Sequence, residues 1–340
     1  MEHLKCLFDA RWSGQHGIGR FSEELNDRLL PYEVLSVGRP MSLFDSIRIS
    51  IILLFNKKSW YLSPGYNGPL FSFLPYVITL HDLNHVDRIE NSNVLKKIYY
   101  RVILKNICKR SVAILTVSDF SKIRISEWSG VDESKIFNVG NGVSSCFEEI
   151  GVKFDLGCEY ILCVSNRKGH KNEKGVLNGF MSASLPNNVK IVFTGMPDGA
   201  IQAEIEKINL TNKVYFTGRV TNDQLAALYR GALFLLFPSF YEGFGLPIVE
   251  AFASGTPVIT SNVTSMPEIA GDAALLVDPS NIADIAAAII KLYYSPELRS
   301  ELTERGLKRV KIFSWDAVAE RVKAAIKTID TNPKHPMKWN

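Results

Sequence analysis

Residues 232–254 read ALFLLFPSFYEGFGLPIVEAFAS: an apolar run, a loop with two glycines, and a second apolar stretch. The first run, Ala232 to Phe237, is apolar at every position, as strands are when both faces of a parallel sheet are covered. After the loop, Pro247 suits the first turn of a helix because its missing N–H would have no partner there. We therefore predict a strand, a glycine-rich loop and a helix from Leu246 to Ser254.

The same alternation of strand and helix extends in both directions from this segment. Short apolar runs predict strands at residues 4–9, 77–80, 113–117, 160–164, 189–194, 214–217, 232–237, 257–260 and 274–277. Longer amphipathic stretches predict helices at residues 21–30, 94–110, 121–129, 173–184, 222–231, 246–254 and 314–329. Repeated strand-then-helix units indicate an α/β fold with doubly wound parallel sheets.

The length of 340 residues indicates two domains. The alternation breaks in a polar stretch after the turn signal Asn141-Gly142 and resumes with a strand at Tyr160. We therefore predict an N-terminal domain at 1–155 and a C-terminal domain at 156–312. A last helix at 313–330 follows them.

Composition excludes several classes of protein. A net charge of +4 is too small for the concentrated basic stripe of a nucleic-acid-binding protein, so we expect no nucleic-acid partner. The five cysteines are odd in number and include no CxxC pair, which indicates neither a disulfide framework nor a zinc site. No apolar run is long enough to span a bilayer, and no signal peptide is visible. We expect a cytoplasmic protein, at most bound to the inner face of the membrane.

Two loops of the N-terminal half carry candidate ligand contacts. Gly14 to Arg20 follows the first strand, and its glycines would let a phosphate approach the start of the next helix. The spacing is GxxGxG, not the GxGxxG of nicotinamide sites, and a plain tight turn is the alternative. His81 ends a strand and can bind a ligand hydroxyl. His81 and His85 form a metal-binding pair only if a third ligand exists, and the sequence indicates none.

Two loops of the C-terminal half carry charge. Arg167, Lys168 and Lys171 follow the first strand of this domain, where a planar guanidinium and an ammonium suit a diphosphate. A solvated charged loop is the alternative. Glu242 and Glu250 bracket the predicted helix start, and a carboxylate such as Glu250 can accept two hydrogen bonds from a ribose diol. Surface carboxylates flanking a turn are the alternative there.

Glu242 and Glu250, with seven residues between them, resemble the signature of the retaining GT-B glycosyltransferases of family four. Other segments resemble that family in the same order along the chain, from Asp9 to Trp315. They are residues 17–21, 79–83, 116–122, 139–143, 216–220, 255–258 and 267–271. The resemblance implies two Rossmann-like doubly wound domains that face a central cleft, with the last helix crossing back to the first domain.

The resemblance also implies roles for individual residues. Catalysis would fall to His81, Glu242, Arg167 and Lys171. The donor would be bound by Gly17, Gly19, Arg167, Lys171, Phe244, Gly245, Leu246 and Glu250. Within that set Arg167 and Lys171 would hold the diphosphate and Glu250 the nucleotide ribose. Ser118 and Ser121 would contact the acceptor. The family works without a metal, so the resemblance implies no cofactor.

As a function, the resemblance implies transfer of mannose from GDP-mannose with retention of anomeric configuration. The acceptor would be a glycan or a lipid-linked oligosaccharide of bacterial surface polysaccharide, either O-antigen or capsule. Three alternatives stay open: transfer of rhamnose or another hexose, a GT-B sugar-nucleotide epimerase, and a protein that binds a sugar nucleotide without catalysis. A dehydrogenase fits poorly because the glycine spacing is wrong.

The predicted helix at 94–110 combines basic and aromatic residues. Lys96, Lys97, Arg101 and Lys105 recur near four-residue spacing, with Tyr99 and Tyr100 among them. Such a helix can lie on an anionic membrane surface. An ordinary helix with a solvated basic face is the alternative.

Overall fold

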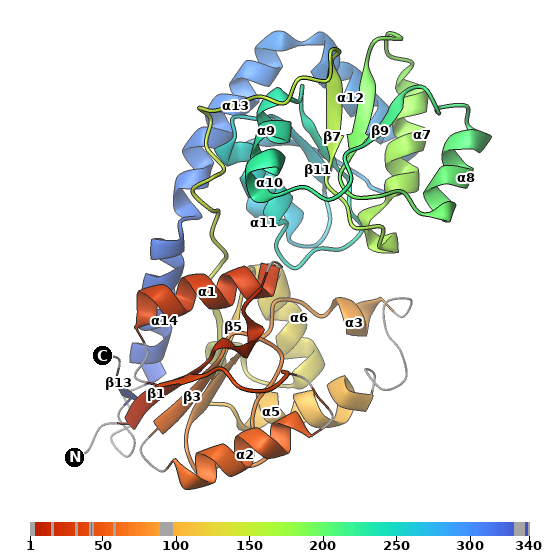
Figure 1. The fold of residues 1–340 in the computed structure, drawn as a ribbon. Coiled ribbons are helices and arrows are strands. Elements are labelled where there is room, and N and C mark those ends of the chain that lie inside the picture. The colour runs from red at the N-terminus through yellow and green to blue at the C-terminus, as the bar shows by residue number, and fades with distance from the viewer. Residues whose placement is uncertain are drawn as a thin grey trace. The chain divides into compact units, whose positions relative to one another are not determined.

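The structure is a computed structural model that describes residues 4–14, 17–30, 33–40, 42, 44–56, 59–88, 98–329 and 337–338. The chain forms two compact units, coloured along the sequence in Figure 1. Unit 1 comprises Met1–Gly142 and Trp315–Asn340, and unit 2 comprises Val143–Ser314. Each unit has its own parallel sheet.

The sheet of unit 1 has seven strands in the described part of the chain. They are β1 (Leu4–Asp9), β2 (Glu33–Leu35), β3 (Ser59–Ser63), β4 (Tyr76–Thr79), β5 (Ala113–Thr116), β6 (Ile136–Asn138) and β13 (Met337–Lys338). Their order is β13-β1-β3-β4-β5-β6, with β2 also paired to β1, and every pair is parallel. Strands β4 and β5 are buried at every position, which explains their unbroken apolar sequence.

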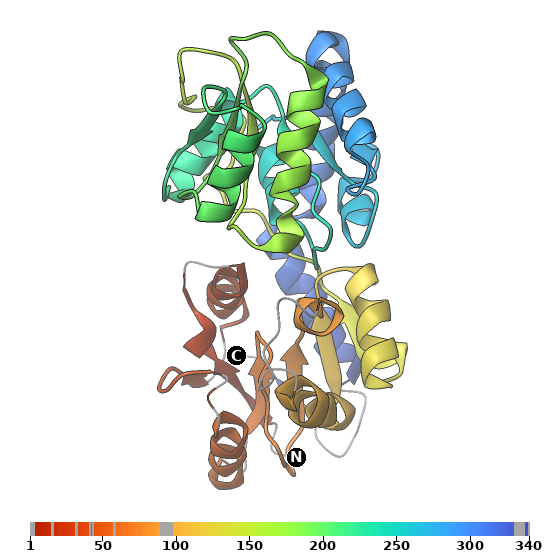
Figure 2. The ribbon, with the colours of Figure 1, turned by 90° about the vertical axis from the view of Figure 1, so that its right-hand side faces the viewer.

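Helices cover both faces of this sheet. They are η1 (Ala10–Trp12), α1 (Gly17–Leu29), α2 (Asp45–Phe55), α3 (Asn84–Asp87), the π-helix η3 (Tyr99–Leu104), α5 (Lys105–Arg110), α6 (Asp119–Ser129), η4 (Glu133–Lys135) and α14 (Trp315–Ile329). Figures 1 and 2 show α1 on one face of the sheet and α2 and α5 on the other. Among the described residues, no helix is long and apolar enough to cross a membrane.

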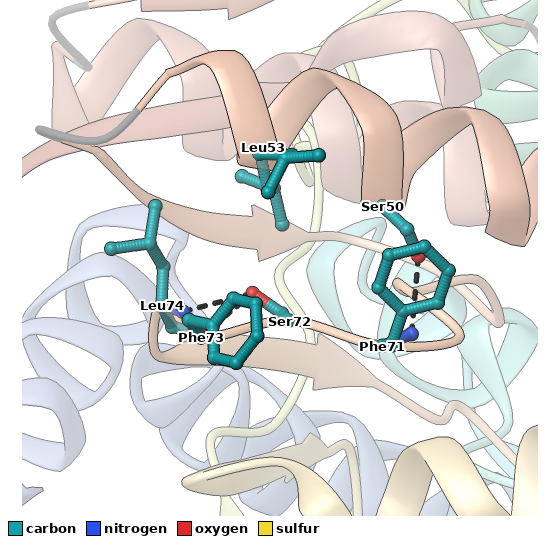
Figure 3. A pocket seen from close by; sticks show the side chains of 7 residues that line it. Ser50, Leu53, Phe71, Ser72, Phe73 and Leu74 are labelled. Carbon is teal, nitrogen blue, oxygen red and sulfur yellow. Dashed lines mark hydrogen bonds between the residues drawn. The ribbon is translucent and has the colours of Figure 1, made fainter.

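An extended segment, residues 64–75, lies beside α2 in place of a helix between β3 and β4. The Leu70 N–H donates to the Ser46 carbonyl at 3.1 Å, and the Phe71 N–H donates to Ser50 Oγ at 3.1 Å. A groove of about 310 Å³ separates the two elements, with Leu53 on one side and Phe73 on the other (Figure 3). The small serine side chains on the inner side of α2 therefore let the backbone of residues 64–75 pack directly against the helix.

A buried polar cluster forms where β1 ends. Arg11 Nη2 lies 2.6 Å from Asp9 Oδ2 and Arg11 Nη1 lies 2.6 Å from Asp45 Oδ1, and these side chains are almost completely buried. Asn67 Nδ2 donates to both carboxylates at 2.9 Å, and the Tyr61 hydroxyl donates to Asp9. Burial alone would lower the pKa of Arg11, but its hydrogen bonds to Asp9 and Asp45 outweigh that effect and raise this pKa. One fixed cation thus pairs with two carboxylates in the core, and hydrogen bonds from Asn67 and Tyr61 stabilise the remaining negative charge.

Helix α14 comes from the end of the chain and packs on α1. The rings of Phe21 and Trp315 meet at 6.2 Å, and Arg28 Nε donates to Asp316 Oδ1 at 2.7 Å. At the start of α1, a Cβ on Gly19 would lie 2.2 Å from the Gly14 carbonyl oxygen. Only glycine fits there, so this glycine is required by backbone packing whatever else it contacts.

The sheet of unit 2 has six parallel strands. They are β7 (Tyr160–Cys163), β8 (Lys190–Phe193), β9 (Val214–Phe216), β10 (Leu235–Phe237), β11 (Val258–Ser261) and β12 (Ala274–Val277). Their order is β12-β11-β10-β7-β8-β9. From β7 the chain adds β8 and β9 on one side, and it then crosses to add β10, β11 and β12 on the other side. The point between β7 and β10 is the topological switch point. Ligands of such folds bind there, beyond the carboxyl ends of the strands.

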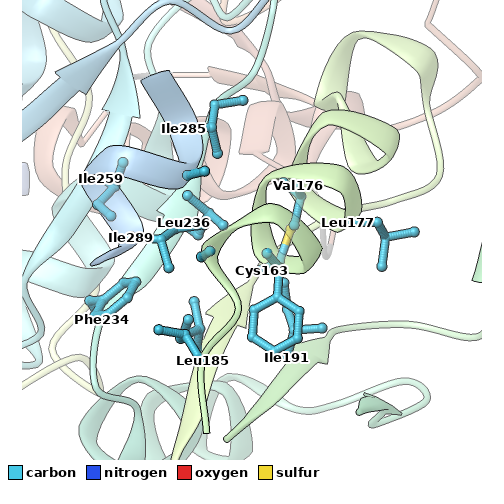
Figure 4. Close-up of a cluster of buried hydrophobic side chains, with 14 of the residues drawn as sticks. Cys163, Val176, Leu177, Leu185, Ile191, Phe234, Leu236, Ile259, Ile285 and Ile289 are labelled. Carbon is cyan, nitrogen blue, oxygen red and sulfur yellow. The ribbon is translucent and has the colours of Figure 1, made fainter. Parts of the chain in front are cut away.

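Helices of unit 2 alternate with these strands. They are η5 (Gly169–Lys171), α7 (Glu173–Ala183), α8 (Gly199–Lys207), α9 (Asn222–Gly231), α10 (Leu246–Ala253), α11 (Met266–Ala270), α12 (Ile282–Tyr294), α13 (Pro296–Arg309) and η6 (Val310–Ile312). Side chains of α7, α8 and α12 pack with the sheet in one core, where Val176, Ile285 and Ile191 meet (Figure 4).

The predicted α/β doubly wound fold is confirmed. The predicted strand at 232–237 begins later, at Leu235, because the Ala232 N–H still bonds the last turn of α9. Of the predicted helix at 94–110, residues 94–97 lie outside the described residues, and the rest is a π-helix followed by a short α-helix. The sequence analysis missed β2, β3, β6, β13, α2, α3, α8, α11, α12 and α13.

The segment from Val143 to residue 155, assigned to the first domain from sequence, belongs to unit 2 by its contacts. Arg230 donates to the carbonyls of Glu148 and Val152, and the Phe154 N–H donates to the Ala227 carbonyl at 2.9 Å. These bonds tie the segment to α9.

Replacing Arg11 by Met should destabilise unit 1. The change leaves Asp9 and Asp45 buried without their cation, which costs about 3–5 kcal/mol. Urea unfolding followed by circular dichroism measures the loss. The exposed Arg101→Met serves as the control and should change stability by less than about 0.5 kcal/mol. Equal stability of the two variants would contradict a structural role for the cluster.

Candidate functional site

Two loops of unit 2 meet at the switch point of its sheet. One follows β7 and carries Lys171, and the other follows β10 and carries Glu242. Lys171 Nζ donates to Glu242 Oε1 at 2.8 Å, although the two residues are 71 positions apart. Both side chains are mostly buried, with 13% and 14% of their surface exposed. The pair therefore sits at the edge of solvent, where a ligand can reach it.

The ammonium of Lys171 has a second neighbour in its own domain. Its Nζ lies 4.8 Å from the centre of the Phe237 ring, at the end of β10. An aromatic face attracts a cation and keeps water from one side of it. Lys171 is thus held in place by one acid and one ring, and an ammonium so placed suits phosphate oxygens.

Asn172 joins three loops of unit 2. Its side-chain amide donates to the carbonyls of Pro238 at 2.9 Å and Pro279 at 2.7 Å, which follow β10 and β12. Its Oδ1 accepts from the Gly175 N–H at 3.2 Å and caps α7. The backbone is left-handed with φ of 56°, which asparagine tolerates better than most residues. Sequence analysis missed this residue, although an asparagine directly before a predicted helix is a cap signal.

Arg167 is held by contacts within unit 2. Its guanidinium donates to the carbonyls of Met196 at 2.9 Å and Thr194 at 2.6 Å, and it pairs with Glu173. It also lies over the ring of Phe216, 5.0 Å from the centre. These contacts anchor the loop after β7 to the end of β8. The predicted role of Arg167 in holding a diphosphate stays a prediction.

The second loop leads into α10 through a left-handed glycine. Gly245 has φ of 100° and precedes Leu246, the first residue of the helix. No side chain caps this helix among the described residues, and Pro247 stands in its first turn. Ser265 Oγ donates to the carbonyls of Glu242 at 2.9 Å and Phe244 at 3.1 Å, which fixes the loop from the far side. Backbone N–H groups at such a helix start attract anions.

Glu250 lies one turn into α10 and is oriented by Tyr229. The Tyr229 hydroxyl donates to Glu250 Oε2 at 2.9 Å. Burial raises the pKa of Tyr229 well above its usual value, and the nearby Glu250 carboxylate raises it further. The hydroxyl therefore stays protonated and acts as a donor. Sequence analysis assigned Glu250 but missed Tyr229, which no motif marks.

The candidate residues of unit 1 lie around the ends of β1 and β4. His81 Nε2 lies 2.8 Å from the Pro64 carbonyl oxygen, and the His81 ring meets the edge of Phe21 at 4.9 Å. Gly17 and Gly19 form the first turn of α1. The ring of His85 packs 5.9 Å from Tyr100. In the part of the chain that the structure describes, no three His, Cys, Asp or Glu side chains are grouped to hold a metal.

Ser118 and Ser121 are both buried at the start of α6. Ser118 Oγ accepts from the Ser121 N–H at 3.1 Å and caps that helix. Ser121 Oγ donates to the His81 carbonyl at 3.3 Å. The two serines thus connect α6 to the His81 loop, and their contact with an acceptor stays a prediction.

The structure brings the predicted residues together in two groups. Unit 2 gathers Lys171 and Glu242 in direct contact, with Phe244, Gly245 and Leu246 following in the same loop. Unit 1 gathers His81 with Ser121 and, through the Phe21 ring, with the start of α1. The unit 2 group has the chemistry of an anion site: one cation, one acid and the start of a helix.

Replacing Asn172 by Asp should destabilise unit 2. The aspartate keeps the size of the side chain and its capping oxygen, but it cannot donate to the two proline carbonyls. Two buried acceptors lose their partners, which costs about 2–4 kcal/mol of unfolding free energy. Thermal and urea unfolding measure the loss. The matched control is Asn187→Asp, because Asn187 is an exposed asparagine of the same unit. A stability equal to that control would disprove the three-loop role of Asn172.

A model of the family described as glycosyl transferases group 1 matches residues 150–309. O-antigen chain mannosyltransferase B of Escherichia coli is 32% identical over 270 residues, covering 74% of this chain and 71% of that protein. O-antigen chain mannosyltransferase RfbU of Salmonella typhimurium is 30% identical over 254 residues, covering 74% and 69%.

A solved structure of HepE from Anabaena, in complex with UDP-glucose, matches with a TM-score of 0.74. The match covers 96% of this chain and 100% of that one at 15% identity, so it speaks for the fold alone. With two parallel doubly wound sheets, the fold is GT-B. The relatives and the family model together place the chain: it belongs to the glycosyl transferases group 1 family and is a glycosyltransferase.

Proposed function

We propose that this glycosyltransferase moves mannose from GDP-mannose to a glycan or lipid-linked acceptor in the synthesis of bacterial surface polysaccharide, O-antigen or capsule. The sugar is supported by two relatives that are named O-antigen chain mannosyltransferases. The observation that carries the site is the Lys171–Glu242 pair at the switch point of unit 2.

In this proposal Lys171 binds the diphosphate of the donor. The ammonium is prepositioned by Glu242 and Phe237, so little side-chain entropy is lost when phosphate oxygens replace part of its surroundings. The start of α10 offers backbone N–H groups to the same anion. Arg167 contributes positive charge from the same loop as Lys171. As the sugar leaves, negative charge grows on the diphosphate, and these groups stabilise it where it develops.

Glu242 and Glu250 take the two ends of the donor. Glu242 accepts hydrogen bonds from hydroxyls of the transferred sugar, together with the backbone of Phe244, Gly245 and Leu246. Glu250, oriented by Tyr229, binds the ribose. His81 contacts the sugar from unit 1, Gly17 and Gly19 approach the distal phosphate, and Ser118 and Ser121 contact the acceptor.

We propose that transfer retains the anomeric configuration by front-face attack. The acceptor oxygen forms a bond to the anomeric carbon on the face from which the diphosphate departs. The bond from that carbon to the phosphate oxygen breaks, and the acceptor proton passes to the leaving diphosphate. The protein then supplies position and charge, with no side-chain nucleophile. No metal takes part in this reaction. We further propose that the reaction takes place on the cytoplasmic side of the membrane. The protein would contact that membrane peripherally through the helix near residues 94–110.

GDP-mannose should raise the melting temperature of the full chain in a concentration-dependent way, because a ligand that binds the folded state stabilises it. Differential scanning fluorimetry with a panel of GDP-, UDP- and dTDP-linked sugars makes this measurement in the presence of EDTA. Replacing Lys171 by Ala should weaken donor binding about 10- to 100-fold, the value of a charge-assisted hydrogen bond.

Lys174→Ala is the matched control, because Lys174 is an exposed lysine three residues further on. A response to a rhamnosyl or other hexosyl donor would replace mannose in the proposal. Release of a 2-epimer without transfer would identify an epimerase, and binding without turnover would identify a non-catalytic protein. A need for added Mg²⁺ would contradict the metal-free mechanism.

Tyr229→Phe should raise the KM for the donor about 5- to 10-fold with little change in kcat, because the orienting bond to Glu250 is lost in ground state and transition state alike. Steady-state kinetics with a saturating acceptor measure both constants. Tyr293→Phe is the control, since the half-buried Tyr293 also donates to a carboxylate, Glu159, at 3.2 Å. A fall in kcat with constant KM would contradict ribose binding by Glu250.

A further inference from the structure

The exposed side of α2 is apolar, although the helix lies on the surface of unit 1. Ile47, Ile51, Leu54 and Phe55 are all exposed, with Phe55 at 83%. The inner side instead carries Ser46 and Ser50 beside Ile49 and Leu53. The outer side of an ordinary surface helix is polar, so the outer side of α2 is unusual.

The inner serines are explained by the fold, but the outer apolar residues are not. Ser46 and Ser50 bind the backbone of the extended segment 64–75. Among the described residues of unit 1, the buried core does not include Ile51 or Phe55, which are 47% and 83% exposed. Exposed apolar side chains in a contiguous group usually mark a surface that binds something.

The apolar surface continues across the groove beside α2. Phe71 and Phe73 lie on the extended segment and are 45% and 89% exposed. Figure 3 shows Phe73 and Leu74 across the groove from Leu53. We call this surface the α2 face: Ile47, Ile51, Leu54, Phe55, Phe71 and Phe73.

Most of the charges around the α2 face are positive, although the exposed Glu33 accepts a hydrogen bond from Asn56 at the end of α2, at 2.6 Å. Within the described segments 44–56, 64–76 and 98–110 the one acidic residue is Asp45, which is buried against Arg11. The basic residues are Arg48, Arg101, Lys105, Lys109 and Arg110, all exposed or half-buried. Arg110 Nη1 donates to the Leu70 carbonyl at 3.0 Å, which places it beside the extended segment. A surface that combines exposed aromatic and aliphatic residues with nearby cations can bind an anionic lipid bilayer.

We propose that the α2 face docks on an anionic lipid bilayer. Phe71, Phe73 and the outer residues of α2 enter the boundary between headgroups and acyl chains, and Arg48 and Lys109 bind lipid phosphates. A second copy of this chain fits less well, because a two-fold contact would set these cations against each other. This proposal is independent of the donor and acceptor proposed above, and it adds α2 and residues 71–73 to the membrane contact proposed for the helix near residues 94–110.

Vesicle flotation of the full chain tests the proposal. The protein should float with phosphatidylcholine vesicles that contain about one third phosphatidylglycerol, and binding should fall with added salt as surface attraction is screened. Phosphatidylcholine alone should bind it at least about tenfold more weakly. The double variant Phe71→Ser and Phe73→Ser should reduce partition onto anionic vesicles by about tenfold or more. Arg48→Gln with Lys109→Gln should reduce it by a similar factor.

Matched controls lie on unit 2. Ile150→Ser with Val152→Ser removes two exposed apolar residues, and Lys291→Gln with Lys311→Gln removes two exposed cations. Both should float like the wild type. The phenylalanine variant should keep its donor-induced melting shift, which separates loss of docking from loss of fold or of donor binding.

Three outcomes would overturn the proposal. The first is a wild-type protein that does not float with anionic vesicles at low salt. The second is a phenylalanine variant that floats as well as the wild type. The third is a concentration-dependent dimer, seen by light scattering, that the phenylalanine variant abolishes, since the α2 face would then join two copies of the chain.

Discussion

The side-chain amide of Asn172 is the contact on which the geometry of the unit 2 site depends. Parallel strands all end at one edge of the sheet, so the loops after β7, β10 and β12 must approach each other there. Their carbonyl groups need donors, and Asn172 supplies two from a single side chain. Lys171 is the next residue along the chain, and its pairing with Glu242 follows from the way Asn172 draws the two loops together.

The two units differ in how deeply their charged clusters are buried. Unit 1 buries Arg11 between two acids and satisfies the carboxylates with Asn67 and Tyr61, so that cluster can only hold structure. Unit 2 leaves the Lys171–Glu242 pair at the edge of solvent. Buried charged groups that already have protein partners are out of reach of a ligand, whereas a partly exposed pair can exchange partners at modest cost.

Much of this architecture could be predicted from the sequence, because buried parallel strands leave continuous apolar runs such as Tyr160 to Cys163. Strand β3 was missed because its sequence, SWYLS, is short and begins and ends with serine. Helix α2 was missed because apolar residues lie on both of its sides, Ile49 and Leu53 inward and Ile51 and Phe55 outward, so no amphipathic pattern is present. The local hydrophobic pattern predicts a helix or strand when apolar residues mark its buried side. The pattern fails where the buried side packs against the backbone of a neighbouring segment, as α2 does against residues 64–75.

In the candidate site, contacts between residues far apart in the sequence could not be predicted. The charged loop at 165–172 and the two glutamates were identified from their positions after apolar strands. The bond of Lys171 to Glu242, and of Arg167 to carbonyls after β8, depends on strand order across the sheet, which the sequence does not spell out. Tyr229 lies on α9 and reaches Glu250 only through packing, so no spacing rule could find it.

The return of α14 to unit 1 bears on how the chain folds as it is made. Unit 2 is one continuous stretch, whereas unit 1 needs a helix that begins at Trp315. Synthesis runs from the N-terminus, so all of unit 2 leaves the ribosome before the helix that covers Phe21 is complete. The second unit can therefore reach its native state first, and the first unit waits with one side of α1 uncovered. A nascent chain that stalls before α14 would therefore expose one side of α1, to which a chaperone could bind.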